Sequence, residues 1–240
     1  MNNEIYILIP SRIGSTRLKN KPLIKLKNKS LIQRVITNAL KVTPNAYVAT
    51  DSDQIKDNIN EISKNVIMTS SMHISGTDRV CEAANKLNLH ENIFILNLQG
   101  DEPFIPISLI YQVVNDFKKN ECDVITVSTE LTSNDQLANP NCVLVETNDK
   151  NFALDFLRSG QIKNPKRHIG IYGYSLKTLN KLVNLNPTDN EKNLKLEQLR
   201  FLENDYSIYV SHFNNMIPNG IDTEEDVLAA IKFIEENEDF

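Results

Sequence analysis

The sequence is short of cysteine and has no apolar run long enough to cross a membrane, and each shortage excludes a class of protein. Its three cysteines, Cys81, Cys122 and Cys142, form an odd set without metal-ligand spacing, so we expect free thiols in a reducing cytosol. The run Ile5–Ile9 is far too short for a membrane span and lacks signal-peptide anatomy. We therefore expect a cytoplasmic protein with no membrane partner.

An excess of positive charge is also missing, because the formal net charge is −5 at pH 7. A nucleic-acid backbone would need a basic stripe, so we do not expect a nucleic-acid partner. A nucleotide is not excluded, since a few local cations and a metal ion can hold a triphosphate. The length of 240 residues, with 40% hydrophobic and 24% charged residues and no repeats, is typical of a single globular domain, which we place at 1–240.

Short apolar runs alternate with amphipathic segments through the first half of the chain. Ile5–Ile9 and Asn92–Leu98 are apolar nearly throughout, which indicates strands covered on both faces. The alternation predicts an α/β fold with a doubly wound, mostly parallel sheet. Further strands are expected at Ala46–Ala49, Asn65–Met68 and Asp123–Val127. Helices are expected at Leu31–Lys41, Asp53–Ser63, Thr77–Leu89 and Ser108–Lys119. Ser30, Ser52 and Ser108 are suitable residues to start helices.

The rhythm changes after Val127, where strand-like pieces follow one another with little helix between them. This pattern predicts a mixed second half within the same domain. We expect strands at Cys142–Val145, Phe152–Leu157, His168–Tyr174 and Ser207–His212, and helices at Leu176–Asn184, Glu191–Glu203 and Thr223–Glu236.

Polar clusters follow three of the predicted strands, at Pro10–Lys21, Thr50–Asp51 and Gln99–Pro103. Ligands of doubly wound sheets bind beyond the carboxyl ends of the strands. The three clusters therefore predict one shared site.

The first cluster combines Arg12, Arg17 and Lys21 with hydroxyl groups and Gly14. Its backbone N–H groups could hold phosphate oxygens while the three cations neutralise their charge. The loop is neither a Walker A nor a G-x-G-x-x-G loop, because the required glycines are missing. A solvated basic loop is the alternative, and the position after a buried strand favours the phosphate-binding interpretation.

Two aspartates are candidate magnesium ligands. Asp101 follows the most apolar predicted strand, and magnesium prefers one or two carboxylates together with substrate phosphate oxygens. A capped turn is the alternative there, and it is the better explanation for Glu102. Asp222 precedes Thr223 and Asp226, which resemble a capping box, so helix initiation alone would account for that segment.

Several other polar residues have equally ordinary explanations. Ser75–Arg79 opens a helix and could act only as a cap, although its small residues would also permit close approach by a nucleoside. His168 has the pattern of an internally hydrogen-bonded histidine, Tyr172 that of a core or pocket-wall residue, and Glu197 that of an exposed helix charge.

Taken in order, these clusters closely resemble the 3-deoxy-manno-octulosonate (Kdo) cytidylyltransferases, and the resemblance covers nearly the whole chain. Each motif alone is weak, whereas their joint order is highly specific. The matching runs are Ile9–Arg12, Ser15–Leu18, Lys21–Leu23, Val48–Asp51, Ser75–Arg79, Asn97–Pro103, Asn139–Asn141, Arg167–Tyr174, Leu196–Arg200 and Ile221–Thr223.

The resemblance implies a nucleotide-diphosphosugar transferase (Rossmann-like) fold and a homodimer, with residues 140–205 serving sugar binding and dimerisation. It also implies a magnesium-dependent reaction of CTP with Kdo, an eight-carbon acidic sugar. Matching the family's motifs to this sequence residue by residue implies the catalytic residues Arg12, Lys21 and Asp101 and the metal ligands Asp101 and Asp222. The implied nucleotide site adds Pro10, Ser15, Arg17, Ser75, Gly76, Thr77 and Gln99. The implied sugar site consists of Gln99, Arg158, His168, Tyr172 and Glu197.

The departures from the family pattern gather on the sugar-binding half. Leu144 stands where lysine is usual, Ala153–Leu157 lacks a usual aromatic and serine, and Ser175 replaces a common arginine. In the phosphate loop, Lys19-Asn20 replaces the usual Pro-Gly. The alternatives are therefore a cytidylyltransferase for a related sugar, such as 8-amino-Kdo or another nulosonate, or a non-catalytic nucleotide-binding homologue.

Overall fold

A computed structural model describes residues 4–14, 17–131, 135–139, 141–158 and 162–237. Ser15, one of the expected nucleotide-site residues, lies outside them. The chain divides into two compact units, the first made of residues 1–107 with 217–240 and the second of residues 108–216. One domain over 1–240 stays a prediction, and the two units are described separately.

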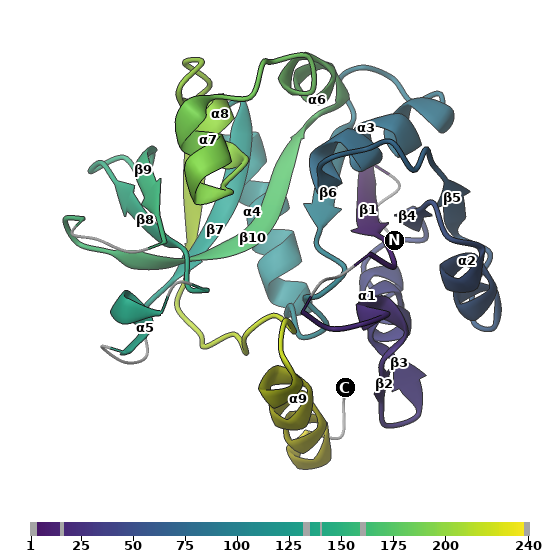
Figure 1. The fold of residues 1–240 in the computed structure, drawn as a ribbon. Coiled ribbons are helices and arrows are strands. Elements are labelled where there is room, and N and C mark those ends of the chain that lie inside the picture. Colours follow the sequence, from purple (N-terminus) through teal and green to yellow (C-terminus); the bar gives the residue numbers. More distant parts are fainter. Residues whose placement is uncertain (1–3, 15–16, 132–134, 140, 159–161, 238–240) are drawn as a thin grey trace. The chain divides into compact units, whose positions relative to one another are not determined.

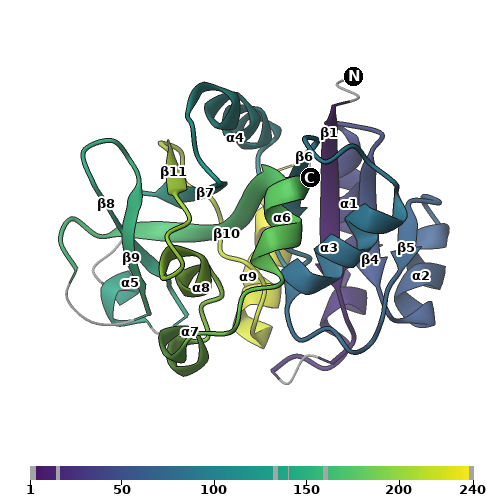
Figure 2. The same cartoon turned by 90° about the horizontal axis from the view of Figure 1, so that it is seen from above.

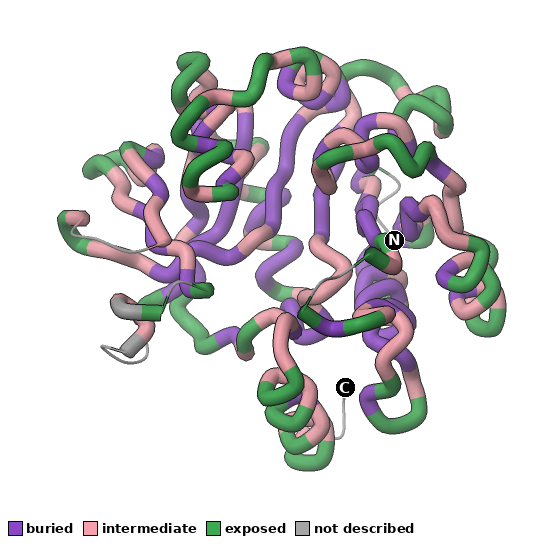
Figure 3. Tube along the Cα trace, in the orientation of Figure 1, coloured by how far each residue is buried: buried purple, intermediate pink, exposed green. Residues whose placement is uncertain are grey.

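A parallel four-stranded sheet forms the centre of the first unit, as the alternating pattern predicts. Its strands are β1 (Ile5–Ser11), β4 (Ala46–Thr50), β5 (Val66–Met68) and β6 (Phe94–Leu98), in the order β6-β1-β4-β5. β1 and β6 are buried along nearly their whole length (Figure 3), because helices cover the sheet.

The helices of the first unit are α1 (Leu31–Leu40), α2 (Asp53–Asn60), α3 (Gly76–Lys86) and α9 (Glu224–Glu236), and the first three contact this sheet. α1 contacts β1, β4 and α2, while α3 lies across the strands in Figure 2 and contacts each of them. The predicted caps Ser30 and Ser52 are confirmed, since each side chain accepts a hydrogen bond from the first helical turn. Only Ala230 of α9 is buried.

The segment between the loop after β1 and α1 contains short elements that the sequence does not predict. These are the 3-10 helix η1 (Lys21–Leu23) and the two-residue strands β2 (Lys25–Leu26) and β3 (Lys29–Ser30). Asn20, just before η1, has the left-handed conformation, with φ 53° and ψ 35°. Asparagine adopts this conformation more readily than most residues other than glycine, so Lys19-Asn20, in place of the Pro-Gly usual in the family that the sequence resembles, is compatible with this turn.

The second unit has a mixed sheet, as predicted (Figure 1). β7 (Val124–Thr129) pairs in parallel with β11 (Ile208–Phe213) and antiparallel with β10 (Lys166–Ser175). β10 also pairs with β8 (Leu144–Thr147), which pairs with β9 (Ala153–Leu157). α4 (Ile107–Lys119) is anchored to β11 through Gln112, which donates hydrogen bonds to Ser211 and to the backbone of His212.

Two helix predictions in this region are wrong in detail. α4 begins at Ile107, so Ser108 lies inside its first turn and does not start it. The expected helix Glu191–Glu203 is broken into α7 (Asp189–Leu194) and α8 (Gln198–Leu202), because Lys195 ends α7 in the left-handed conformation with φ 54°. α5 (Asp135–Ala138) and α6 (Leu176–Leu182) complete the unit, and no helix in the described residues is long and apolar enough to cross a membrane.

Candidate active site

A cavity of about 420 Å³ opens in the first unit at the carboxyl ends of β1 and β6, and this volume is in the range of small-molecule sites. Two of the three polar clusters expected at strand ends, those after β1 and β6, contribute to it. It is lined by Pro10, Ser11, Arg12, Gly14, Arg17, Lys21, Pro22, His73, Ile74, Ser75, Gly76, Arg79, Gln99, Gly100, Asp101 and Asp222.

A carboxylate–lysine cluster, made of Asp101, Asp222, Lys21 and Arg17, lies at the wall of this cavity. The Lys21 Nζ atom donates to Asp101 Oδ2 at 2.6 Å and to Asp222 Oδ1 at 3.0 Å. Arg17 donates to the other oxygen of Asp222 at 3.0 Å. Side chains that are 80 and 201 positions from Lys21 in the sequence therefore meet on one ammonium group.

The charges of this cluster determine the protonation state of Lys21. Burial lowers the pKa of Lys21, but attraction and hydrogen bonds from Asp101 and Asp222 outweigh burial and raise that pKa above its ordinary 10.5. Lys21 is consequently a fixed cation that holds the two carboxylates together.

Backbone contacts hold the two aspartates in place. The backbone N–H of Ile221 donates to the carbonyl of Asp101 at 2.9 Å, which joins the 217–222 segment to the loop after β6. A Cβ atom at Gly100 would lie only 2.9 Å from the Pro10 carbonyl oxygen. Glycine is therefore needed at position 100 for the ends of β1 and β6 to approach this closely.

The pair Asp101 and Asp222 fits a magnesium ion. Their shared partner in the structure is a cation, the Lys21 ammonium group, so the geometry already accommodates positive charge between them. No group of three or more His, Cys, Asp or Glu suited to a metal occurs in the described part of the chain. Two carboxylates completed by phosphate oxygens are the arrangement that magnesium prefers over a full protein cage.

Ser11 gives the cavity an unused hydrogen-bonding group. Its Oγ atom is buried and has no hydrogen-bond partner among the described residues. A buried hydroxyl without a partner costs free energy, and a bound ligand can satisfy it. Together with the exposed Arg12 and Arg17 guanidinium groups, Ser11 suits an anionic, oxygen-rich ligand.

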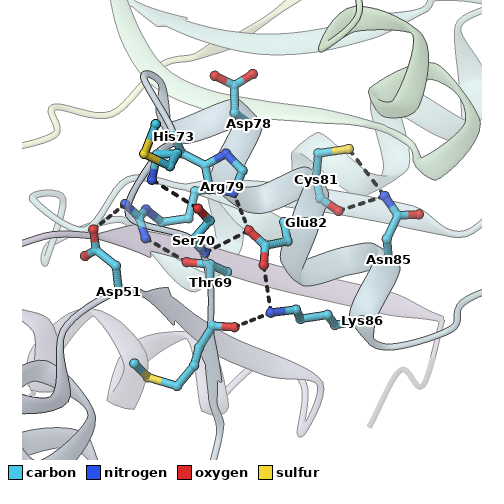
Figure 4. Close-up of polar contacts among 12 residues, drawn as sticks. Asp51, Thr69, Ser70, His73, Asp78, Arg79, Cys81, Glu82, Asn85 and Lys86 are labelled. Atoms are coloured by element: carbon cyan, nitrogen blue, oxygen red, sulfur yellow. Dashed lines mark hydrogen bonds and ion pairs between the residues drawn. The ribbon is translucent and has the colours of Figure 1, made fainter.

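The N-terminus of α3 forms another part of the cavity wall. Ser75 caps this helix by accepting from the Asp78 backbone N–H at 3.1 Å, and Asp78 accepts in return, so the capping interpretation is correct for the local geometry. Ser75 and Gly76 also line the cavity, whereas Thr77 is buried and is not among the lining residues. Arg79, only 2% exposed, donates to Thr69 Oγ1 at 2.6 Å and to Asp51 Oδ2 at 3.1 Å (Figure 4).

A second cluster, in the second unit, contains expected sugar-site residues. His168 is buried, shares a 2.8 Å hydrogen bond with Thr126 Oγ1, and packs edge-on against Phe156. Burial and the charges of Arg158 and Arg167 lower the pKa of His168 to about 3, so its imidazole is neutral at pH 7. The internal hydrogen bond expected of a core histidine is therefore present, and its role toward a sugar stays a prediction.

Tyr172 lies near His168, with ring centroids 5.7 Å apart, and donates to Gln198 Oε1 at 3.0 Å. Burial and the Glu197 carboxylate raise the pKa of Tyr172 well above its ordinary 10.0, so the phenol is protonated. The buried Gln198 Nε2 atom has no partner among the described residues and can donate to a ligand.

Arg158 and Glu197 have structural roles that the sequence analysis does not predict. Arg158 donates to the carbonyls of Leu194 at 2.8 Å and Lys195 at 3.2 Å, where α7 ends. Glu197 is the residue before α8, so it belongs to the break between helices and not to the exposed face of one long helix. Gln99, the remaining expected sugar-site residue, lines the cavity of the first unit.

Sequence reasoning missed four residues with site-like features: Ser11, His73, Arg79 and Gln198. Ser11 and Arg79 belong to two of the runs that carry the family resemblance, Ile9–Arg12 and Ser75–Arg79. Nothing in the local sequence, however, indicates that Ser11 has a buried hydroxyl without a partner or that Arg79 is a buried cation. His73 precedes the α3 cap by two residues, and this closeness to a small-residue helix start was the one available signal. Gln198 adjoins Glu197, yet its burial depends on the break at Lys195.

The parallel sheet, the strand-end cavity and its paired carboxylates suit a nucleotidyltransferase, and the similarity to known proteins shows that the chain is one. The sequence model of the cytidylyltransferase family matches residues 6–208. A relative from Rickettsia canadensis named 3-deoxy-manno-octulosonate cytidylyltransferase is 39% identical, covering 98% of this chain and 97% of its own. One of the same name from Thermodesulfovibrio yellowstonii is 42% identical, covering 94% and 96%. The chain belongs to the 3-deoxy-manno-octulosonate cytidylyltransferase family.

Solved structures agree with this fold. The structure of CMP:2-keto-3-deoxy-manno-octonic acid synthetase complexed with CTP superimposes with a TM-score of 0.88 at 30% identity, covering 97% of this chain and 98% of the other. A glucose-1-phosphate thymidylyltransferase from Bacillus anthracis superimposes with a TM-score of 0.69 at 13% identity, covering 95% and 94% of the two chains, which supports the fold alone.

Proposed function

We propose that this protein transfers CMP from CTP to the anomeric hydroxyl of Kdo, releasing pyrophosphate and supplying CMP-Kdo for lipopolysaccharide synthesis. The observation that carries the proposal is the carboxylate–lysine cluster at the wall of a strand-end cavity in a chain of this family. Such a cluster provides what phosphoryl-transfer chemistry needs, which is positioning and charge neutralisation more than covalent catalysis.

The triphosphate of CTP binds beside Arg12, Arg17 and Lys21, whose positive charges offset its negative ones. Ser11 Oγ donates to one of its oxygens. The cytidine occupies the side of the cavity formed by Ser75 and Gly76, where the absence of large side chains permits close approach.

Asp101 and Asp222 would hold Mg²⁺, with phosphate oxygens completing its ligands. When bound, Mg²⁺ neutralises the triphosphate and lowers the pKa of the attacking hydroxyl. Lys21 is close to both carboxylates and can then pair with phosphate, so a positive charge stays at this point throughout the reaction. The sugar oxygen forms a bond to the α-phosphorus of CTP as the bond to pyrophosphate breaks.

In the second unit, the acidic sugar binds to Arg158, His168, Tyr172 and Glu197. In support, His168 and Tyr172 are neutral at pH 7 and therefore serve as uncharged hydrogen-bonding groups toward sugar hydroxyls. The departures from the family pattern at Leu144 and Ala153–Leu157 favour testing 8-amino-Kdo and other nulosonates beside Kdo.

The protein acts as a homodimer in the cytoplasm, without nucleic-acid or membrane partners. The three cysteines are free thiols in the structure, in keeping with a reducing compartment. The formal charge of −5 offers no general attraction to nucleic acid.

A pyrophosphate-release assay with purified protein, CTP, Mg²⁺ and a panel of nulosonates tests the proposal. We expect release that depends on both Mg²⁺ and a sugar, with Kdo as the best acceptor. Faster release with 8-amino-Kdo would move the assignment to that sugar. If none of the sugars supports pyrophosphate release, but CTP still raises the melting temperature, the protein is a non-catalytic nucleotide-binding homologue instead.

A further inference from the structure

The loop from Thr69 to Ile74 forms part of the cavity wall, yet apolar packing does not hold it. His73 and Ile74 line the cavity, but Ile74 is 86% exposed and Met72 is 84% exposed. Thr69 is the only residue between 69 and 74 that is buried. Because little apolar surface is removed from water here, polar contacts must determine the shape of this loop.

Those polar contacts come largely from α3, and Glu82 makes most of them (Figure 4). One Glu82 oxygen accepts a hydrogen bond from the Ser70 backbone N–H at 2.9 Å and is also hydrogen-bonded to the His73 imidazole. Its other oxygen accepts from Lys86 at 2.7 Å, and Lys86 donates in turn to the Met68 carbonyl at 2.7 Å. Glu82 thus connects both ends of the loop to one rigid helix.

The charge on Glu82 is well stabilised. Burial raises the pKa of Glu82, but hydrogen bonds from Lys86, Ser70 and His73 outweigh burial and lower that pKa to about 2. The carboxylate is therefore ionised at any working pH. Arg79, one turn earlier on α3, fixes the start of the loop by its hydrogen bond to Thr69.

We propose that Glu82 is a positioning residue for nucleotide binding, which holds the Thr69–Ile74 loop in the shape that completes the cavity wall. Glu82 does not line the cavity and acts only through Ser70 and His73. Without Glu82, the loop would become ordered only when the nucleotide binds. The conformational entropy lost in that step would weaken nucleotide binding without changing the chemical step. The inference rests on the proposed CTP site.

Steady-state kinetics of Glu82→Ala and Glu82→Gln provide the first test. We expect Glu82→Ala to raise the KM for CTP roughly tenfold while kcat stays within about threefold of the wild type, since an interaction made equally in ground and transition states is lost. Glu82→Gln should be intermediate, because its amide oxygen still accepts from Ser70 but has lost the charge. The Gln variant carries the comparison if the Ala variant does not fold.

Glu61→Gln is the matched control, because Glu61 is also a hydrogen-bonded glutamate of the first unit, accepting from Gln33 at 2.8 Å, but lies outside the cavity. It should leave the KM for CTP unchanged.

A tryptophan at position 72 provides a second readout that does not depend on CTP. The chain has no tryptophan, and Met72 is exposed and does not line the cavity, so Met72→Trp would be a single reporter in the loop. We expect acrylamide quenching and fast anisotropy decay at this tryptophan to increase in the Glu82→Ala background and not in the Glu61→Gln background.

An unchanged KM in folded Glu82→Ala would overturn the proposal, whether or not the reporter shows a looser loop. Failure of the wild type to bind CTP would instead refute the proposed function, and the reporter would still show whether Glu82 orders the loop.

Discussion

Asp101→Asn separates the catalytic role of the carboxylate–lysine cluster from its structural one, because the substitution keeps the side-chain shape and removes one charge. Lys21 would lose its 2.6 Å contact with a carboxylate and keep the 3.0 Å contact with Asp222. Asp101 is about one third exposed, so this ion pair contributes at most about 1 kcal/mol to stability. In a chain of this size that corresponds to roughly 2–4 °C in melting temperature.

The effect on turnover should be much larger. Asp101 is one of the two carboxylates proposed to hold Mg²⁺, so its loss weakens the electrostatic stabilisation that the ion gives the reacting phosphates. Losing one preorganised electrostatic contribution of this kind typically costs about 10²- to 10³-fold in kcat. We expect Asp101→Asn to lower kcat in the pyrophosphate assay by at least about a hundredfold at saturating CTP, with only a small change in melting temperature.

Glu102→Gln is the matched control, since Glu102 is the adjacent carboxylate in the same loop but does not line the cavity. Its kcat should be near that of the wild type. A kcat for Asp101→Asn within tenfold of the wild type would refute the role given to Asp101. A fall of more than about 10 °C in melting temperature would indicate that Asp101 is chiefly structural.

Three further predictions concern other parts of the molecule. Asn20→Val should destabilise the protein by about 1–2 kcal/mol and Asn20→Gly should not, because of the left-handed backbone; equal urea midpoints would contradict this. Ser11→Ala should not lower the melting temperature, because the hydroxyl has no partner to lose, but should raise the KM for CTP several-fold. An unchanged KM would show that its hydroxyl is not used. Because the pKa of His168 is about 3 when folded and about 6.5 when unfolded, the unfolded state binds more protons between these values. The stability advantage of wild type over His168→Asn should thus shrink by about 2 kcal/mol from pH 7.5 to pH 5 in urea titrations, and a constant advantage would argue against a buried neutral imidazole.

Local patterns were enough to predict the features of the fold that depend on local physics. The central strands β1 and β6 are buried on both faces, which leaves an apolar run in the sequence. The caps at Ser30 and at Thr223 with Asp226 involve residues three positions apart, so they too are readable from the sequence. The helix break at Lys195 could not be predicted, because lysine gives no signal for a left-handed helix end.

In the candidate site, too, features that depend on local sequence could be predicted, and features that depend on distant contacts could not. The strand-end loops with Arg12 and Asp101 could be predicted from their positions after apolar runs. The shared hydrogen bonding of Lys21 to Asp101 and Asp222 could not, since it joins segments far apart in the chain. The same is true of Arg79, whose partners Thr69 and Asp51 are fixed only when β4, β5 and α3 pack together.

Phosphorus-31 NMR of a reaction containing the protein, CTP, Mg²⁺ and Kdo tests the central claim most directly. We predict loss of the three CTP signals with equimolar appearance of pyrophosphate and of a single phosphodiester signal from CMP-Kdo, and no such conversion with Asp101→Asn. Hydrolysis to CMP and pyrophosphate without the phosphodiester, or unchanged CTP with wild-type protein, would contradict the proposed transfer.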